Sequence, residues 1–173
     1  RDSVGLGMRG PGAVENFSLI PGVEVVALCD FVKERAEKQN ERLRKNGLAP
    51  AAVYYGEKGY EELCKRPDID LVYIATDWEH HAIVAKCALE NGKNVADEVP
   101  SAMNLKECWE LVDLAEKNQL NCMILENCCY DWFEMRTLNM AQAGVFGEIL
   151  RAQGAYIHNL DDFWDYYWKN PNG

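Results

Sequence analysis

The feature of this chain that most constrains its fold is a regular alternation between short apolar runs and helical patterns. Strand-like apolar runs are predicted over residues 23–30, 51–56, 69–76, 94–98 and 120–127. Helices are predicted between and after them, over residues 31–47, 59–68, 80–93, 104–118 and 132–144. Such alternation builds right-handed βαβ units, and near-continuous apolar strands indicate a parallel sheet covered on both faces. The expected fold class is therefore α/β, with a doubly wound parallel sheet.

A different pattern begins after residue 144. Residues 148–160 are predicted to form a long strand with polar alternation, and the aromatic-rich stretch that follows shows no clear period. A lone strand with an aromatic tail cannot bury itself, since even two-stranded pieces are marginal. We therefore expect a first domain over residues 1–128 with a clipped first strand. Residues 129–173 are expected to be the incomplete start of a second α/β domain.

Charge and composition argue against several classes of protein. The 173-residue chain has a formal net charge of −10, and its basic residues gather only modestly, within residues 33–45. Nucleic-acid binding needs a basic face and is not expected. No apolar run reaches membrane-spanning length, so no membrane partner is expected. The seven cysteines form no C-x-x-C pair and no zinc-like spacing with histidine, so we expect buried, reduced thiols and no metal site.

A glycine-rich segment, GLGMRG, stands near the start of the chain. Gly5, Gly7 and Gly10 have the G-x-G-x-x-G spacing of a turn that brings backbone close to a pyrophosphate and packs a helix closely on a strand. Pro11 suits the first turn of that helix, whose unpaired N–H groups can bind an anion. The spacing alone is weak evidence, because glycine-rich turns are common. Together with the alternation it predicts a Rossmann-like, dinucleotide-binding fold.

An acid at the end of the next predicted strand indicates which dinucleotide is bound. Asp30 lies twenty residues after Gly10, where a carboxylate binds the ribose hydroxyls and repels a 2′-phosphate. This favours NAD over NADP, although Arg9 could also reach a phosphate. The alternative is a structural turn followed by a solvated aspartate.

Polar residues also follow three other predicted strands. Thr76, Glu98 and Asn127 stand at their carboxyl ends, and Trp78 and His81 come just beyond the first. These strand ends line the ligand crevice of a doubly wound sheet, so we expect the five residues to converge near the nicotinamide. Each also has a plain alternative, such as a surface position for His81, a cap for Glu98 or a turn for Asn127.

A further candidate pair lies in the segment GAYIHN. In a strand, Tyr156 and His158 point to the same face. A tyrosine beside a histidine can bind sugar hydroxyls or move protons, so both are candidate catalytic residues. The alternative is an aromatic face that packs against the second domain.

Several segments together resemble a known family. They are GLGMRG, ALCD, YIATDWEHH, EVPSAM, LENCCYD, LNMAQAGVFGEIL and GAYIHNLDDFW. They are similar to the glucose–fructose oxidoreductase/inositol dehydrogenase superfamily, and more narrowly to its NAD-dependent α-N-acetylgalactosaminidases, glycoside hydrolase family 109. The resemblance implies a Rossmann domain, a second α/β domain on a large open sheet, and a tightly held NAD that is recycled within each turnover.

The resemblance also implies roles for individual residues. The cofactor contacts that it implies are Met8, Arg9, Asp30, the stretch 78–81, Glu98, Val99 and Asn127. Tyr156 is implied to contact the sugar, while further sugar-binding residues of the family lie beyond this chain. The implied partner is a small carbohydrate, and a homo-oligomer through the second domain fits the resemblance. A periplasmic or secreted location is also suggested by the family.

One departure from the family bears on the chemistry. Its dehydrogenases carry Glu-Lys-Pro where this chain has Glu98-Val99-Pro100, and that lysine helps to move the proton of the substrate hydroxyl. Valine has no titratable group and cannot replace it. The resemblance implies a glycosidase that releases terminal α-N-acetylgalactosamine by transient oxidation at C3, elimination, addition of water and re-reduction. Two alternatives stay open: a sugar dehydrogenase with another base, and a non-catalytic NAD-binding module.

Overall fold

The structure of the protein is a computed structural model that describes residues 2–155 and 157–159. The chain divides into two compact units, Arg1–Leu125 and Glu126–Gly173, and each is described by itself. The predicted domain boundary between residues 128 and 129 stays a prediction.

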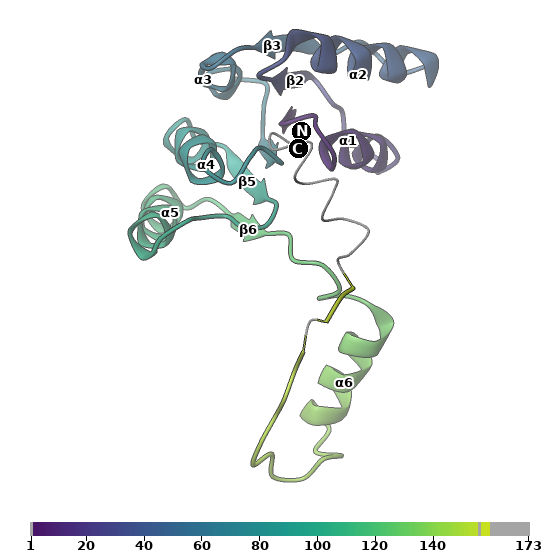
Figure 1. Ribbon diagram of the computed structural model, residues 1–173, viewed down its shortest axis with the longest axis vertical. Coiled ribbons are helices and arrows are strands. Elements are labelled where there is room, and N and C mark those ends of the chain that lie inside the picture. The colour runs from purple at the N-terminus through teal and green to yellow at the C-terminus, as the bar shows by residue number, and fades with distance from the viewer. Residues whose placement is uncertain (1, 156, 160–173) are drawn as a thin grey trace. The chain divides into compact units, whose positions relative to one another are not determined.

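The first unit is built on a six-stranded sheet in which every pair of neighbouring strands is parallel (Figure 1). The strands are β1 (Asp2–Val4), β2 (Ala27–Asp30), β3 (Ala52–Tyr55), β4 (Leu71–Ile74), β5 (Asn94–Asp97) and β6 (Cys122–Ile124). Their order is β3-β2-β1-β4-β5-β6, so the chain adds strands first on one side of β1 and then on the other. The sheet is therefore doubly wound, and its topological switch point lies between β1 and β4. The predicted α/β fold class is confirmed.

Helices cover both faces of this sheet (Figure 1). They are α1 (Gly10–Ser18), α2 (Lys33–Lys45), α3 (Gly59–Cys64), α4 (His81–Glu90) and α5 (Leu105–Asn118). One buried core joins α1 and α2 to the sheet and includes Val14 and Leu28. The other core joins α3, α4 and α5 to the sheet and includes Leu63, Leu89 and Cys29. The neighbours Leu28 and Cys29 in β2 therefore face opposite layers, as the alternation of side chains along a strand requires.

The observed elements agree with the predicted ones in type, and they differ at their ends. The strand predicted from residue 23 begins at Ala27, and the strand predicted to residue 127 ends at Ile124. The start of α5 agrees to within one residue, because its cap is encoded locally. The Asn104 side chain accepts a hydrogen bond from the Glu107 N–H at 3.0 Å, and the Glu107 carboxylate accepts one from the Met103 N–H at 2.7 Å.

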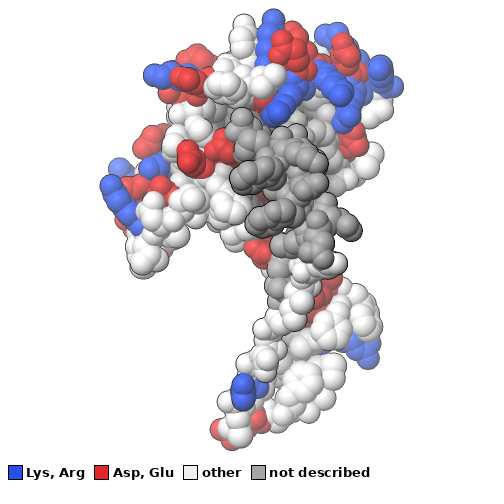
Figure 2. Space-filling model, in the orientation of Figure 1, with Lys and Arg blue, Asp and Glu red and all other residues white. Residues whose placement is uncertain are grey.

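Basic and acidic side chains are interleaved along α2, as the space-filling view shows (Figure 2). Lys33 Nζ lies 3.4 Å from Glu37 Oε1, and Arg42 Nη1 lies 3.7 Å from Glu15 Oε1. The modest basic cluster over residues 33–45 therefore presents mixed charge rather than a basic stripe. Within the described residues, no helix combines the length and the apolar character needed to cross a membrane.

The second unit contains α6 (Trp132–Gln142), on which Arg136 lies over the Trp132 ring at 5.1 Å from its centroid. Residues 148–155 and 157–159 form no strand, so the strand predicted over residues 148–160 is wrong for its described part. A strand is held by hydrogen bonds to a neighbouring strand, and no described segment of this unit provides one.

The cysteines are less buried than predicted. All seven are free thiols, and only Cys29 and Cys64 are fully buried. Cys87 and Cys122 are half-buried, and the prediction of buried thiols is wrong for Cys108, Cys128 and Cys129, which are exposed. Cys108 lies on the exposed side of α5, and Cys128 and Cys129 belong to the second unit.

Candidate cofactor-binding site

The glycine turn that joins β1 to α1 leaves no room for a side chain at two positions. Gly5 has a φ of +91°, and a Cβ added there would lie 2.3 Å from the carbonyl oxygen of Ala75. A Cβ added at Gly10 would lie 2.0 Å from the carbonyl oxygen of Gly5. The Gly5 N–H also donates to the Cys29 carbonyl oxygen at 2.9 Å. The turn therefore packs against the carboxyl ends of β2 and β4, where ligands bind in this kind of sheet.

The start of α1 offers backbone donors to an anion. Arg9, at the N-cap, makes no side-chain cap, the first turn has no acidic residue, and a proline occupies a position that needs no N–H donor. Met8 and Arg9 are exposed and Gly7 is half-buried. Tight backbone packing beside an uncapped helix start fits the pyrophosphate of a dinucleotide, because its oxygens would accept these N–H groups.

Asp30 ties the glycine turn to the end of β2. Its Oδ2 accepts the Leu6 N–H at 2.7 Å, and its Oδ1 accepts the Val32 N–H at 2.8 Å. Arg35 lies 3.9 Å from Oδ1, and Asp30 is only 5% exposed. Both oxygens therefore already serve the backbone, a role that spacing did not reveal. A carboxylate oxygen has a second lone pair, so the predicted contact with the ribose fits this geometry and stays a prediction.

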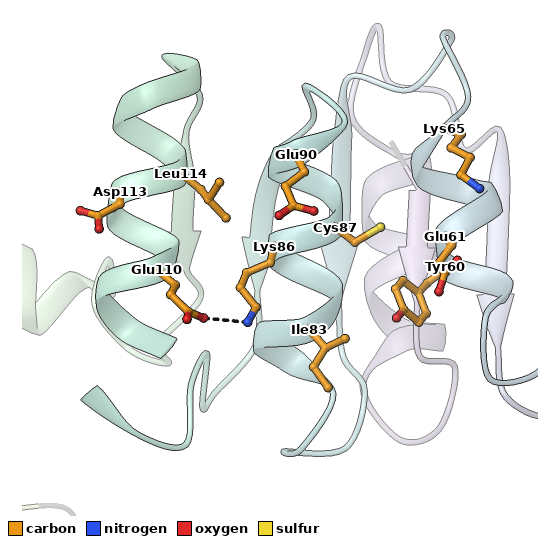
Figure 3. Close-up of a pocket in the computed structure, with 10 residues that line it drawn as sticks. All are labelled: Tyr60, Glu61, Lys65, Ile83, Lys86, Cys87, Glu90, Glu110, Asp113 and Leu114. Carbon is orange, nitrogen blue, oxygen red and sulfur yellow. Dashed lines mark hydrogen bonds and ion pairs between the residues drawn. The ribbon is translucent and has the colours of Figure 1, made fainter. Parts of the chain in front are cut away.

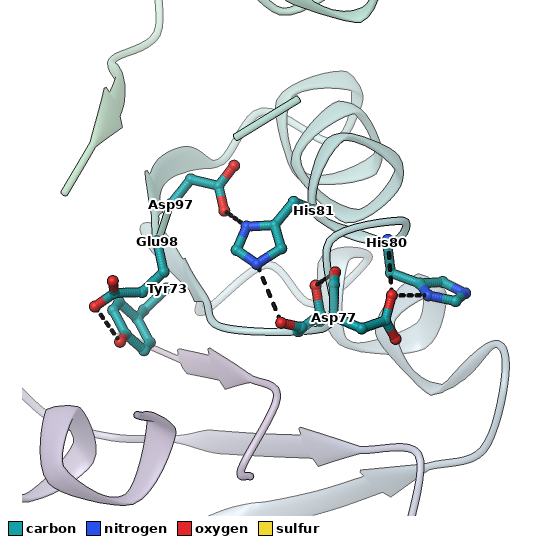
Figure 4. Close-up of polar contacts among 7 residues, drawn as sticks. Tyr73, Asp77, His80, His81, Asp97 and Glu98 are labelled. Atoms are coloured by element: carbon teal, nitrogen blue, oxygen red, sulfur yellow. Dashed lines mark hydrogen bonds and ion pairs between the residues drawn. The ribbon is translucent and has the colours of Figure 1, made fainter. Parts of the chain in front are cut away.

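Glu98 lies at the carboxyl end of β5 beside a buried tyrosine (Figure 4). The Tyr73 hydroxyl donates to Glu98 Oε1 at 2.9 Å, and Tyr73 is 2% exposed. Burial and the Glu98 carboxylate raise the pKa of Tyr73 above its usual range, and the charge of Arg9 acts in the opposite direction. Phe17 packs edge-on against the same ring, with 5.2 Å between the centroids. Glu98 is thus connected through Tyr73 to β4 and α1, and Val99 follows it with 44% of its surface exposed.

His81 and Asp97 form a buried polar pair (Figure 4). His81 Nδ1 lies 2.6 Å from Asp97 Oδ1, and its Nε2 lies 3.1 Å from the Thr76 carbonyl oxygen. A carbonyl oxygen can only accept, so Nε2 carries a proton. Burial opposes charge on the imidazole, but the Asp97 carboxylate and the Thr76 carbonyl outweigh it and raise the pKa of His81. Burial also raises the pKa of Asp97, against the effect of His81.

This pair braces the loop that precedes α4. His81 stands at the start of α4 and holds the loop after β4 at Thr76 and the end of β5 at Asp97. Its side chain is 2% exposed, with both ring nitrogens engaged inside the protein. Asp97 Oδ2 is buried and has no hydrogen-bond partner among the described residues. The predicted contact of His81 with the cofactor stays a prediction, and the structure assigns its ring a positioning role.

Thr76 and Trp78 lie in the loop held by this brace. The Thr76 hydroxyl donates to the Asp77 carbonyl oxygen at 3.1 Å, and the Asp77 carboxylate accepts the His80 N–H at 3.1 Å. The His80 ring also lies on the surface, 2.7 Å from the same carboxylate. Trp78 is 63% exposed at the carboxyl side of β4. A flat, exposed ring on a fixed loop is well placed to contact a ligand in the crevice.

Three predicted site residues belong to the second unit. Asn127 belongs to the second unit, where it lies exposed in a turn. His158 is exposed in the same unit, in a segment without helix or strand. Tyr156 lies outside the described residues. The roles predicted for these three residues stay predictions.

Sequence reasoning missed Tyr73 and Asp97. Both are polar residues inside apolar strand runs, and a polar side chain that is buried in a sheet needs a hydrogen-bond partner. That rule would have marked both as candidates. It would not have identified their partners, Glu98 and His81, because each pair is formed between different elements.

Comparison with known proteins agrees with this geometry. A family model described as an oxidoreductase family with an NAD-binding Rossmann fold matches residues 3–126. The myo-inositol dehydrogenase of Lactobacillus casei, solved with NAD(H) and myo-inositol, has a TM-score of 0.74 and 25% identity, covering 84% of this chain and 42% of that one. A probable dehydrogenase from Thermotoga maritima has a TM-score of 0.74 at 20% identity, covering 84% and 41%, and shows the fold alone. The predicted cofactor, NAD, is confirmed by the family match.

Curated relatives point to a narrower group. Glycosyl hydrolase family 109 protein 5 of Phocaeicola vulgatus is 74% identical over 167 residues, which cover 96% of this chain and 32% of the relative. Glycosyl hydrolase family 109 protein 1 of Bacteroides thetaiotaomicron is 60% identical over 168 residues, which cover 96% and 36%. The chain therefore spans about a third of the length of these relatives.

Proposed function

Because the chain belongs to the oxidoreductase family with an NAD-binding Rossmann fold, we propose that it is the cofactor-holding part of an NAD-dependent glycosidase. The proposed substrate is a sugar chain that ends in α-linked N-acetylgalactosamine. The high identity to proteins named glycosyl hydrolase family 109 supports the reaction class. The fold and the glycine turn support the use of NAD.

The observation that carries this proposal is the uncharged residue beside Glu98. Val99 is 44% exposed at the carboxyl end of β5, where the resemblance to family dehydrogenases predicts a lysine. Net oxidation of a sugar hydroxyl needs a group that takes up its proton, and valine has none. A reaction that borrows a hydride and returns it leaves no net redox change, but its first step also releases the hydroxyl proton. Val99 therefore separates this site from that of the family dehydrogenases, the identity to family 109 proteins favours the glycosidase, and a group other than residue 99 must take up the proton.

The described residues have distinct tasks in this proposal. Bound NAD would supply reversible removal of a hydride from a sugar carbon. The glycine turn and the start of α1 would hold its pyrophosphate, and Tyr73 fixes the orientation of Glu98. The pair of His81 and Asp97 fixes the loop that presents Trp78. Because oxidation activates the sugar, the two flanking carboxylates of most glycosidases are not needed.

The test is hydrolysis of a chromogenic α-N-acetylgalactosaminide by the full-length protein, with no NAD added. We expect release of the chromophore, and one nucleotide per chain on heat denaturation, because a recycled cofactor stays bound. The matched control is the same glycoside with a β linkage. Consumption of added NAD⁺ in step with the sugar, without release of the chromophore, would instead identify a sugar dehydrogenase.

A sugar dehydrogenase is the second candidate, and one observation favours it. The fold of the described chain resembles that of a myo-inositol dehydrogenase at 25% identity. In that case another group, such as His158 or a residue beyond this chain, would take the proton in place of the lysine. A third outcome of the assay, bound NAD without turnover of any sugar, would identify a non-catalytic NAD-binding module.

A further inference from the structure

A cavity of about 630 Å³ opens between α3, α4 and α5, on the helical layer opposite α1 and α2 (Figure 3). Its walls carry both charges, and Lys86 bridges to Glu110 across it at 2.7 Å. The carboxylates outnumber the ammonium groups: they are Glu61, Glu90, Glu110 and Asp113, against Lys65 and Lys86. The cavity is therefore acidic overall and disfavours anionic ligands.

Cys87 on α4 lines this cavity, and Cys64 at the end of α3 lies buried behind it. Cys87 is half-buried, and its side chain points toward α3 in Figure 3. Cys64 is 0% exposed and belongs to the core against which Cys87 packs. The two thiols are close enough for each to perturb the pKa of the other. The Asn91 side-chain amide also lies 3.8 Å from Cys87 Sγ, as a donor.

The surroundings of the two thiols make them unequal. The interaction with Cys64 lowers the pKa of Cys87 below its usual value, and Lys65 acts in the same direction, against burial and the nearby Glu61 and Glu90. The same interaction and full burial raise the pKa of Cys64. The thiolate is the nucleophilic form of cysteine, so the thiol that faces solvent is also the one better prepared to react.

We propose that Cys87 and Cys64 form a redox-active thiol pair, in which a small neutral peroxide oxidises Cys87 and Cys64 then closes a disulfide between α3 and α4. This pair lies apart from the proposed cofactor crevice, and its chemistry does not depend on the glycosidase proposal. The acidic walls favour an uncharged oxidant such as hydrogen peroxide over an anionic one such as glutathione disulfide.

The reaction balances in two steps. The Cys87 thiolate attacks one peroxide oxygen, the O–O bond breaks, and hydroxide leaves and takes a proton to become water. Cys87 is then a sulfenic acid. The Cys64 sulfur attacks the Cys87 sulfur, the S–O bond breaks, and the departing hydroxide takes the Cys64 proton to become a second water. Two thiols and one peroxide thus give one disulfide and two waters.

The test treats the reduced full-length protein with a small excess of hydrogen peroxide, and then blocks free thiols and maps the peptides. We expect a peptide that links Cys64 to Cys87, is released by dithiothreitol and forms with joint loss of both free thiols. Exposed Cys108 serves as the internal control and should stay largely reduced over the same time. The Cys108→Ser variant should form the same link at an unchanged rate.

Two variants separate the steps. In Cys64→Ala, the sulfenic acid on Cys87 should persist and be trapped by dimedone, and in Cys87→Ser, Cys64 should stay reduced. If Cys64→Ala does not fold, the crosslink in the unmodified sequence decides alone. The proposal is overturned if Cys87 reacts no faster than Cys108 and no link to Cys64 forms. It is also overturned if Cys87 is oxidised to sulfinic acid while Cys64 stays reduced.

Discussion

The sharpest prediction concerns Gly10 and Gly12, which lie two residues apart in α1. A Cβ at Gly10 would lie 2.0 Å from the Gly5 carbonyl oxygen, whereas ordinary contact begins near 3.4 Å. The Gly10→Ala change therefore demands a shift of about 1.4 Å (3.4 − 2.0) between two backbone segments that have no flexible side chain to move aside. A Cβ at Gly12 meets nothing within 4 Å, so Gly12→Ala is a matched control.

The shift acts on stability and on cofactor binding. Overpacking of this kind costs about 1–3 kcal/mol of the free energy of unfolding. The same movement displaces the N–H groups at the start of α1, and a hydrogen bond to a charged group contributes about 1.5–3 kcal/mol. Loss of one such bond weakens NAD binding by roughly ten- to 150-fold, at about 1.4 kcal/mol per factor of ten. Gly12→Ala should instead stabilise the helix by about 0.5–1 kcal/mol, with unchanged affinity.

Calorimetric titration of NAD⁺ into protein freed of nucleotide measures the affinity, and thermal unfolding measures the stability. The expected result is a raised Kd and a lower Tm for Gly10→Ala alone. Wild-type affinity in Gly10→Ala would refute the inference that this turn cradles the pyrophosphate. An equal loss of affinity in Gly12→Ala would show that the effect does not come from the contact with Gly5.

Three further predictions test the rest of the site. Tyr73→Phe removes the hydrogen bond to the Glu98 carboxylate, so we expect the free energy of unfolding, measured by denaturant titration, to fall by about 1.5–3 kcal/mol. The control Tyr55→Phe, at an exposed position, should change it by less than about 0.5 kcal/mol. The raised pKa of His81 means that the folded protein holds the imidazole proton more tightly than the unfolded chain does, so the free energy of unfolding should fall as pH rises above about 6.5. The Asp97→Asn variant, whose amide can donate to a neutral ring, should show a flatter pH dependence, and an unchanged slope would contradict the pairing of His81 with Asp97. In the full-length protein, Val99→Lys should slow glycoside hydrolysis by about tenfold or more, because it places an ammonium beside Glu98. The uncharged Val99→Met variant should keep the wild-type rate, and equal rates for the lysine variant and the wild type would show that Val99 does not govern the chemistry.

The order and type of the elements were predictable because they depend on local patterns. Strand β4 is apolar along most of its length since both of its faces are covered, and α5 begins at a cap formed by nearby residues. The start of β2 was placed too early for a physical reason. Val25 and Val26 are apolar because they pack against the two cores, yet they do so from the connection before the strand.

The placement of site residues was only partly predictable. The rule that ligands bind at strand ends located Thr76, Trp78 and Glu98 at one edge of the sheet. It could not show that His81 turns inward, since that depends on Asp97, sixteen residues away on another element. The second unit shows the same limit, because the strand predicted over residues 148–160 needs a partner that its own sequence does not specify.

The double hydrogen bond of Asp30 has a consequence for anyone who wishes to re-engineer the choice of cofactor. An acid at this position is expected to bind the ribose hydroxyls and repel a 2′-phosphate, so its replacement is the natural first step toward NADP. Here the same carboxylate holds Leu6 inside the glycine turn and Val32 at the entry to α2. Nucleotide preference and the shape of the phosphate cradle thus share one side chain. A successful redesign must first give the Leu6 N–H another acceptor, and only then remove the acid.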